Sequence, residues 1–339
     1  MVRFRNGWLV AVVAVVGFGA AACKNKDSAN AGGAGGMAGS PGQLAGGASG
    51  PVDDLALLPA DSEVVLGFNF AQLQQSGLWK EFLPKLKDKM SGQFAEMKAA
   101  CGFDPLEAVK SFSIAMRNLD GGKPDGVLVM HGPSKAKVMG CTDKLKAEAA
   151  KNGSEVTVDG DVITVKDKNG ETTAATFIND TTVIGVFGAK GTKDGVKAAA
   201  MGGSALKTSS SFMEMYSKIK PGQSLWLLVS GNSPALSKAN AMGVKPKAVF
   251  GSVNITDGLA VDLRVRLGTP QEATQLVNMA KGQTGNAQVK SMFDTLDVVT
   301  DGNDAKITLA MSNQKLHGLI GMVGGMIGGM IPAQDKSGQ

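Results

Sequence analysis

The side chains that most often carry out chemistry are scarce in this chain of 339 residues, which has two histidines, one tyrosine and three cysteines. His131 and His317 each lack a second histidine or cysteine at the spacing of a zinc site. No G-x-S-x-G motif marks a nucleophile that either histidine could serve as a base. We therefore expect both histidines to be structural or exposed. We predict a protein with no catalytic residue, no metal and no cofactor, which is not an enzyme.

Two short motifs have a formal likeness to functional loops. Ser134-x-x-Lys137 fits the S-x-x-K pattern, but the partner motifs of that pattern are missing, so we interpret Ser134 as a helix cap. Gly185-x-x-Gly188-x-x-Gly191 is rich in glycine like a phosphate-binding loop, but it has the spacing of neither common type. We interpret this segment as the turn between a strand and a helix.

Cys101 and Cys141 are the only cysteines beyond the N-terminal leader. The leader indicates export, and exported proteins fold in an oxidising compartment where cysteines pair. We therefore predict a disulfide between Cys101 and Cys141. The alternative is a buried free thiol, because Cys141 falls on the apolar face of an expected helix.

The N-terminus has the three parts of a secretory signal, which we place at residues 1–22. Arg3 and Arg5 supply the positive start, and an uncharged apolar run follows from Trp8 to Phe18. Three alanines then provide small residues at the cleavage site. The apolar run is shorter than the roughly 20 residues that span a bilayer. We therefore predict a signal peptide rather than a membrane span.

A small-residue triplet directly before Cys23 resembles the lipobox of bacterial lipoproteins, although Ala20 stands where leucine is usual. The resemblance implies that Cys23 becomes the acylated first residue of the mature protein, carrying palmitate or a similar chain. Ala20-x-Ala22 also fits ordinary cleavage, so plain secretion and an uncleaved anchor stay open. Lys24 follows the cysteine where such lipoproteins carry aspartate for inner-membrane retention. This difference favours the outer membrane, facing the periplasm.

Residues 23–54 form the expected tether between this anchor and the folded part. Ser28 to Gly50 consists almost entirely of glycine, alanine and serine. Such a segment buries too little apolar surface to fold by itself, so we expect disorder. A flexible chain of this length has a typical reach of roughly 30 Å.

The rest of the chain has the composition of a folded domain. Apolar residues make up 43% of the chain and charged residues 19%, which permits a core. The net charge is +5, but basic and acidic residues alternate and aromatics are only 5%. A nucleic-acid-binding surface would concentrate basic and aromatic side chains. We therefore expect no nucleic-acid partner.

Hydrophobic periodicity predicts an α+β fold. We expect helices from Leu78 to Met97, kinked or split at Pro84, from Ser134 to Lys151, and after the capping boxes at Asp104 and Thr269. The expected strands are Glu63–Phe70, Ser111–Arg117, Gly126–His131, Glu155–Val158, Val162–Val165, Thr172–Ile178, Thr182–Phe187, Ser224–Ser230, Gly258–Leu267, Asp297–Thr300 and Lys306–Met311. Asp-Gly and Asn-Gly turns between the short strands indicate an antiparallel meander.

The second half of the chain reads as a shortened copy of the first. Ser224–Ser230 would correspond to Glu63–Phe70, and Gly258–Leu267 to Gly126–His131. The last two strands, which flank Asp301-Gly302, would correspond to the pair that flanks Asp159-Gly160. We therefore predict two similar sub-domains of mostly antiparallel sheet with packed helices. These are placed at 55–205 and 220–331, with a connecting helix at 206–219 and a disordered tail at 332–339.

Gly318–Ile331 reads GLIGMVGGMIGGMI and has glycines at intervals of four residues. Glycine costs about 1 kcal/mol in a helix relative to alanine, so tertiary packing must compensate. We expect a helix whose glycine face packs on the sheet or on another helix. The alternative is that this face pairs with a membrane or with another small-residue helix.

Residues 55–331 resemble a class of proteobacterial lipoproteins with no established activity. The matching segments are Leu58-Pro59-Ala60-Asp61, Ser76-Gly77-Leu78-Trp79 and Cys101-Gly102-x-Asp104-Pro105. We expect a lipid-anchored, non-catalytic cell-envelope protein with a structural or interaction role. Its partners would be the membrane, through Cys23, and an envelope protein. The alternative is a periplasmic carrier or binding protein for an apolar ligand, because 17 methionines could line a pliable pocket.

Overall fold

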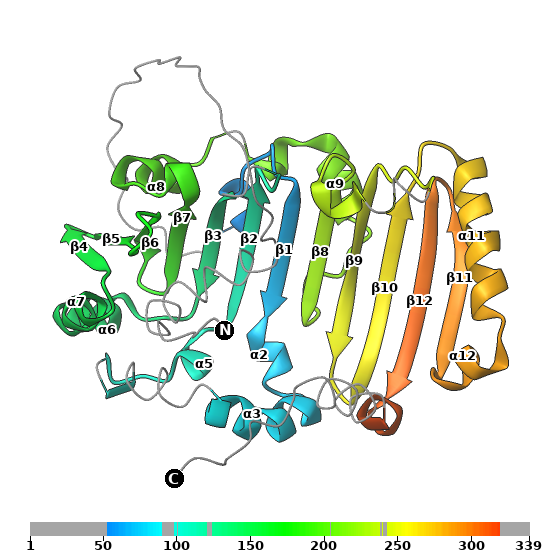
Figure 1. Ribbon diagram of the computed structural model, residues 1–339, viewed down its shortest axis with the longest axis horizontal. Coiled ribbons are helices and arrows are strands. Elements are labelled where there is room, and N and C mark those ends of the chain that lie inside the picture. Colours follow the sequence, from blue (N-terminus) through cyan, green and yellow to red (C-terminus); the bar gives the residue numbers. More distant parts are fainter. Residues whose placement is uncertain are drawn as a thin grey trace, which may run out of the picture. The chain divides into compact units, whose positions relative to one another are not determined.

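The computed structural model describes residues 53–89, 98–99, 101–120, 124–203, 205–237, 239 and 243–318. The signal peptide, Cys23, the expected tether except for Asp53 and Asp54, residues 319–331 and the tail lie outside them. The chain divides into two compact units. Among the described residues, unit 1 comprises those within 53–68, 86–217 and 232–235, and unit 2 those within 69–85, 218–231 and 236–318. Each is a mixture of helices and antiparallel sheet, as the α+β prediction requires (Figure 1).

The described residues of unit 1 form seven strands in the order β1-β2-β3-β7-β6-β5-β4. Their bounds are β1 Val64–Asn69, β2 Ser111–Arg117, β3 Asp125–His131, β4 Glu155–Asp159, β5 Val162–Lys166, β6 Thr172–Asn179 and β7 Thr182–Phe187. The predicted meander β4-β5-β6-β7 is confirmed. Gly160 turns the chain between β4 and β5 with φ of 61°, a left-handed conformation that favours glycine.

The helices of unit 1 are short. They are α5 Pro105–Ala108, α6 Lys135–Gly140, α7 Thr142–Lys151, α8 Lys193–Ala200 and α9 Ser210–Tyr216, with 3-10 turns η1 Asp54–Ala56, η2 Gly188–Lys190 and η3 Leu206–Thr208. The expected helix at 134–151 is interrupted at Cys141, which ends α6 and precedes α7. Helix α7 packs beside β4, and α8 packs against β5, β6 and β7.

Unit 2 contains five strands in the order β8-β9-β10-β12-β11. They are β8 Leu225–Ser230, β9 Ala248–Ile255, β10 Gly258–Arg266, β11 Thr295–Asp301 and β12 Asp304–Ser312. The other elements are α2 Phe70–Leu73, α11 Pro270–Thr284 and α12 Ala287–Ser291, together with α3 Gly77–Lys89, whose last residues belong to unit 1. The turn η4 Pro234–Leu236 has its first two residues in unit 1 and Leu236 in unit 2. Helix α11 packs along β11 and β12 (Figure 1). Pro84 lies inside α3.

The two units share one topology, which makes them the two similar sub-domains that the sequence predicted. Each has three consecutive antiparallel strands, then a helical segment, then a meander whose last strand returns to pair with the third strand. That last strand is β7 in unit 1 and β12 in unit 2. The meander of unit 1 has two extra strands, so β11 and β12 occupy the places of β6 and β7. The expected correspondence with β4 and β5 is therefore wrong.

The unit boundaries also differ from the linear division expected at 55–205, 206–219 and 220–331. Residues 69–85, which follow β1, belong to unit 2. Residues 232–235, which follow β8, belong to unit 1, as do 206–217 with α9. The segment after the first strand of each unit is therefore part of the other unit. Strand β9 was missed by the sequence analysis altogether.

Candidate binding face

The sheet of unit 1 carries an apolar face, which we call the Phe/Met face. In an antiparallel sheet, residues that pair directly across strands point to the same side. The register therefore defines three rows of this face. They are Phe112–Met130–Val183–Phe177, then Ile114–Leu128–Gly185–Ala175–Ile163–Val158, and then Met116–Gly126–Phe187–Thr173–Val165–Val156.

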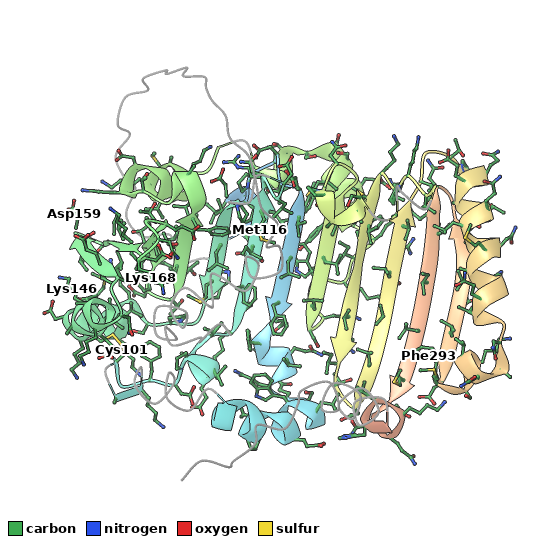
Figure 2. The ribbon with its side chains drawn as sticks, in the orientation of Figure 1. Cys101, Met116, Lys146, Asp159, Lys168 and Phe293 are labelled. Atoms are coloured by element: carbon green, nitrogen blue, oxygen red, sulfur yellow. A yellow bond between two sulfur atoms is a disulfide. The ribbon has the colours of Figure 1, made fainter. Side chains whose placement is uncertain are left out.

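Burial differs sharply between the centre of the Phe/Met face and its larger side chains. Ile114 and Leu128 are 5% and 1% exposed and form a cluster with larger neighbours. Eight other members of the face are partly exposed: Phe112, Met116, Met130, Val156, Val158, Ile163, Phe177 and Phe187. Met116 is labelled on β2 in Figure 2. The face thus leaves a band of phenylalanine, methionine and branched side chains in contact with solvent.

The opposite face of the same sheet is the real core of unit 1. Val65, Val129, Ala174 and Ile184 have no exposed surface there, and Val186 is 2% exposed. An antiparallel sheet with one covered face ordinarily turns polar residues to the other side. Here the second face is apolar as well, and contiguous apolar surface on a folded protein marks a site of interaction. We therefore take the Phe/Met face as the candidate functional site.

His131, singled out in the sequence, joins the first turn of the described chain to the sheet. Its Nε2 lies 2.7 Å from Asp54 Oδ1 in η1, and its Nδ1 lies 3.2 Å from Thr182 Oγ1 on β7. Ser113 Oγ donates to the second oxygen of Asp54 at 2.7 Å. Asp54, His131 and Thr182 are in the order acid, histidine, hydroxyl of a catalytic triad. Thr182 is only 2% exposed, however, so a substrate has no access to its hydroxyl. The cluster fixes η1 on β2, β3 and β7.

Sequence reasoning missed Asp54 and Thr182 as partners of His131, because 77 and 51 residues separate them from it in the chain. His317 lies elsewhere, in unit 2, with Nε2 3.0 Å from Glu81 Oε2. Tyr216, the single tyrosine, stacks on Phe212 in α9. Burial raises the pKa of the Tyr216 hydroxyl, and the nearby Asp54 and Asp53 raise it further.

The two glycine and serine motifs occupy the places expected of them. Ser134 is the residue before α6, although its side chain makes no capping hydrogen bond there. Gly188 and Gly191 lie in the turn between β7 and α8. A Cβ on Gly191 would stand 2.0 Å from the carbonyl oxygen of Thr172. Glycine is therefore needed at this position for close backbone packing.

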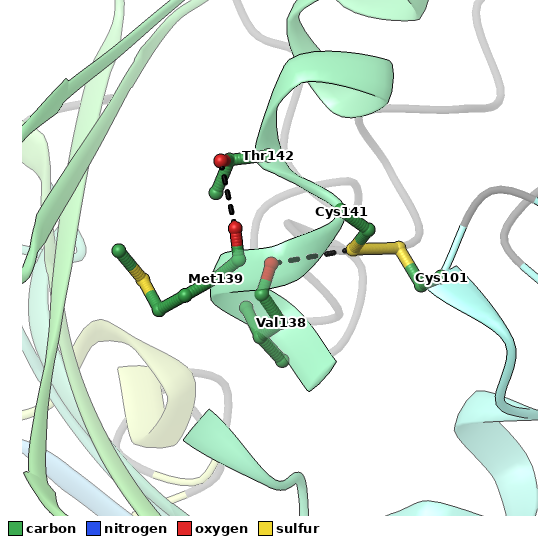
Figure 3. Close-up of a disulfide and its surroundings, with 5 residues drawn as sticks. All are labelled: Cys101, Val138, Met139, Cys141 and Thr142. Carbon is green, nitrogen blue, oxygen red and sulfur yellow. Dashed lines mark hydrogen bonds between the residues drawn. A yellow bond between two sulfur atoms is a disulfide. The ribbon is translucent and has the colours of Figure 1, made fainter. Parts of the chain in front are cut away.

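The predicted disulfide is present. Cys101 and Cys141 are bonded, with their Cα atoms 4.9 Å apart (Figure 3). Cys141 is 3% exposed and packs with Leu145 of α7, so the cysteine is on the apolar helix face that the periodicity indicated. Thr142 Oγ1 donates to the carbonyl oxygen of Met139 at 2.9 Å beside the bridge. The bond links the segment before α5 to the junction of α6 and α7.

Unit 2 contains a buried ionic cluster on β10 and β12. The side chain of Asp304 has no exposed surface and accepts hydrogen bonds from Arg266 and, at 2.8 Å, from Lys218 Nζ. Burial alone would raise the pKa of this carboxyl, but the bonds from Arg266 and Lys218 outweigh burial and lower it. Arg264 pairs with Asp301 and lies 3.8 Å from Asp304. Every charge in the cluster faces an opposite charge, so we assign it to the stability of the sheet.

Two further kinds of site are absent from the residues that the structure describes. Among them, no group of three or more His, Cys, Asp or Glu side chains could hold a metal ion. Within the same ranges, no helix is both long enough and apolar enough to cross a membrane.

The chain resembles solved structures of low sequence identity. No protein-family model matches the chain, and no curated protein matches its sequence. The chain is similar to the solved structure titled "Structure of crystal form I of TP0453", with a TM-score of 0.48 and 11% identity over 80% of this chain and 97% of that one. Crystal form III of TP0453 gives a TM-score of 0.47 and 12% identity over 80% and 98%.

Proposed function

We propose that this chain is a lipid-anchored, non-catalytic protein of the cell envelope whose Phe/Met face binds an apolar partner. The observation that carries the proposal is the apolar character of both faces of the unit 1 sheet. One face forms the core, while the other keeps Phe112, Met130, Phe177 and Phe187 in partial contact with solvent. Fully burying a side chain of this size contributes roughly 1.5–3 kcal/mol. Because the fold already buries most of each side chain, a partner gains only a part of this value from each, and it must cover most of the face to offset the cost of association.

The chemistry of the face suits an interaction role. Phenylalanine and methionine are enriched at the centres of protein interfaces. Methionine is unbranched and adapts to irregular surfaces, and Met116 and Met130 flank the buried centre formed by Ile114 and Leu128. We infer that the leading partner is another envelope protein.

The proposed anchor agrees with such a role. Acylation of Cys23 would hold the protein at the outer membrane, facing the periplasm, and the tether would let the folded units move roughly 30 Å from it. A partner in the same membrane would then be searched for in two dimensions at high effective concentration.

The second candidate function is that of a periplasmic carrier for an apolar ligand. It is favoured by the same face, because an acyl chain or sterol-like molecule would cover the rows of branched side chains near Ile163 and Val158 as well as a protein would. The two functions differ in what contacts the face and not in where contact occurs.

A photo-cross-linking experiment in living cells separates these functions. The photo-reactive amino acid p-benzoylphenylalanine is placed at position 177 or, as a control, at position 157. Phe177 belongs to the Phe/Met face, whereas Thr157 of β4 is exposed on the opposite side of the sheet. A protein adduct specific to position 177 supports the interaction role, and an adduct of a small apolar molecule supports the carrier. Equal adducts at both positions, or none at 177, would contradict the Phe/Met face as a binding site.

A further inference from the structure

The outer edge of β11 carries backbone groups that pair with no other strand. β11 is the last strand of the unit 2 sheet and pairs only with β12 (Figure 1). A two-residue turn joins the two strands, so the residues that flank it, Asp301 and Asp304, exchange backbone hydrogen bonds. Because hydrogen bonding alternates along an antiparallel strand, the N–H and C=O groups of Leu296, Val298 and Thr300 point away from β12. No backbone group of the described residues bonds them there.

This edge lacks most of the features that keep exposed strands from pairing. Such strands are usually very short, or carry proline, lysine or a bulge. β11 has seven residues, with the sequence TLDVVTD, and most of them are of types that favour strands. Its protection consists of two exposed acids, Asp297 and Asp301, which point to the side opposite α11. Val298, on the other side, packs with Val277 of α11.

One of the two acids has no compensating charge. Asp301 pairs with Arg264 of β10. Asp297 stands opposite Thr308 of β12, and in the described part of the chain it forms neither an ion pair nor a side-chain hydrogen bond. Opposite charges that face each other across strands stabilise their pairing, and like charges oppose it. The β11 edge therefore favours an added strand with a cation opposite Asp297.

The outer strand of unit 1, β4, differs in both respects. It has five residues and directs fewer backbone groups outward. Its acids face cations already, because Asp159 pairs with Lys193, and Glu155 stands opposite Lys166 on β5. The combination of a longer unpaired edge with an uncompensated acid is thus a feature of β11.

We propose that the β11 edge binds an extended, basic peptide segment of a partner protein, which adds a strand to the unit 2 sheet. Backbone hydrogen bonds to Leu296, Val298 and Thr300 would supply affinity, as at other sheet edges that bind peptides. In antiparallel pairing, the peptide residues that make these bonds point to the side of α11, and the alternate residues point to the side of Asp297 and Asp301. The recognised segment therefore alternates strand-forming, uncharged residues with lysine or arginine.

A second copy of the chain fits this edge less well than a basic peptide. Residues paired across strands point to the same side of a sheet. A second β11 would therefore place its own Asp297 and Asp301 on the side that already holds these acids. The proposed segment brings opposite charges there instead. This inference concerns unit 2 and is independent of the proposed function, which concerns the Phe/Met face of unit 1.

Synthetic peptides of alternating valine and lysine test the added strand. They carry a fluorescent label, and their binding to the full chain with Cys23→Ser is followed by fluorescence anisotropy. We expect at least tenfold tighter binding than for the same peptide with glutamate in place of lysine. N-methylation of the valine amides, which would face β11, should abolish binding, whereas N-methylation of the lysine amides should leave it unchanged. Equal binding of the two methylated peptides would show attraction between charges alone and would overturn the proposal.

Variants of the chain locate the binding. Thr300→Pro removes an N–H that points away from β12, so the pairing of the two strands is retained, and we expect at least a tenfold loss of affinity for the lysine peptide. Asp297→Lys changes an exposed side chain without a described partner, so it does not depend on the proline variant folding, and it should cause a similar loss. Asp257→Lys, in the exposed turn between β9 and β10, is the matched control and should bind as the native chain does.

Two results would overturn the assignment to this edge. One is an equal effect of Asp297→Lys and Asp257→Lys, which would mean that only the total charge of the chain matters. The other is a dimer of the native chain that Thr300→Pro dissociates, because the β11 edge would then belong to a second copy. Sedimentation of the native chain and of this variant distinguishes that case.

Discussion

The ring of Phe187 occupies the space above Gly126, on the neighbouring strand of the Phe/Met face. A Cβ on Gly126 would stand 2.1 Å from Phe187 Cζ and 2.8 Å from the carbonyl oxygen of Ala115. Because Gly126 has no side chain, the ring of Phe187 can lie close to the backbone of β3. This contact holds one end of the candidate binding face in shape.

Gly126→Ala should destabilise unit 1, because the new methyl group displaces the ring and presses on the backbone of β2. Overpacking of this kind costs about 1–3 kcal/mol, to be measured by urea unfolding. Gly185→Ala is the matched control on the adjoining row, since its Cβ would meet nothing nearer than 3.8 Å. Equal stability of the two variants would show that the ring does not depend on Gly126.

The buried carboxyl of Asp304 should be far more important for stability than its neighbour Asp301. Asp304→Ala leaves Arg266 and Lys218 facing an empty, buried site, and breaking such a pair costs about 3–5 kcal/mol. The side chain of Asp301 is half exposed, so Asp301→Ala should cost at most about 1 kcal/mol. Thermal unfolding of both variants compares these losses. A smaller loss for Asp304→Ala than for Asp301→Ala would contradict the assignment.

The lowered pKa of Asp304 also predicts a dependence on pH. An unfolded aspartate titrates near 3.9, so the contribution of Asp304 to stability is complete above that pH. It is lost as the pH falls through the lower pKa of the folded state. The difference in unfolding free energy between the native chain and Asp304→Asn should therefore shrink as the pH falls from about 5 to 2. A constant difference would mean that the carboxyl stays charged, or stays neutral, throughout.

Loss of the Cys101–Cys141 bond should cost about 4 kcal/mol, from the entropy of closing a loop of about 40 residues. Reduction of the native chain and the double change Cys101→Ala, Cys141→Ala should lower the unfolding free energy alike. The double variant should not respond to reductant. A reductant effect that persists in it would point to another cause.

Acylation of Cys23 is tested by mass spectrometry of the mature N-terminal peptide. We expect a diacylated or triacylated cysteine, and we expect Cys23→Ser to release the protein from the membrane while its melting temperature stays the same. An unmodified cysteine in a soluble periplasmic pool would leave plain secretion as the better account.

Features that depend on neighbouring residues in the chain could be predicted from the sequence. Asp159-Gly160 and Asp301-Gly302 predicted turns that occur, since both glycines adopt positive φ. Strand β9 was missed because Gly251 and Ser252 interrupt its apolar pattern. The structure gives the reason for Gly251: a Cβ there would stand 2.1 Å from the carbonyl oxygen of Asp262 on β10. This requirement comes from a neighbouring strand, so the residues around Gly251 in the sequence do not reveal it.

The Phe/Met face could not be predicted from the sequence for a similar reason. Alternation in β2 and β3 is incomplete, because both sides of these strands are apolar, and only the register shows that Phe112 and Met130 stand together. The pairing of Asp54 with His131 joins residues 77 positions apart and has no periodic signature. The disulfide could be predicted because Cys101 and Cys141 are the only cysteines beyond the leader.

The central claim, that the Phe/Met face binds an apolar partner, is tested most directly by recovery of that partner from membranes. The double change Ile163→Gln, Phe177→Gln alters two partly exposed members of the face, and Thr157→Gln, Lys166→Gln alters two exposed residues on the opposite side of β4 and β5. Loss of about 1.4 kcal/mol of binding free energy is a tenfold change in affinity. We predict at least a tenfold drop in co-purified partner for the first variant and none for the second, with both chains folded. Equal recovery from the two variants would contradict the account.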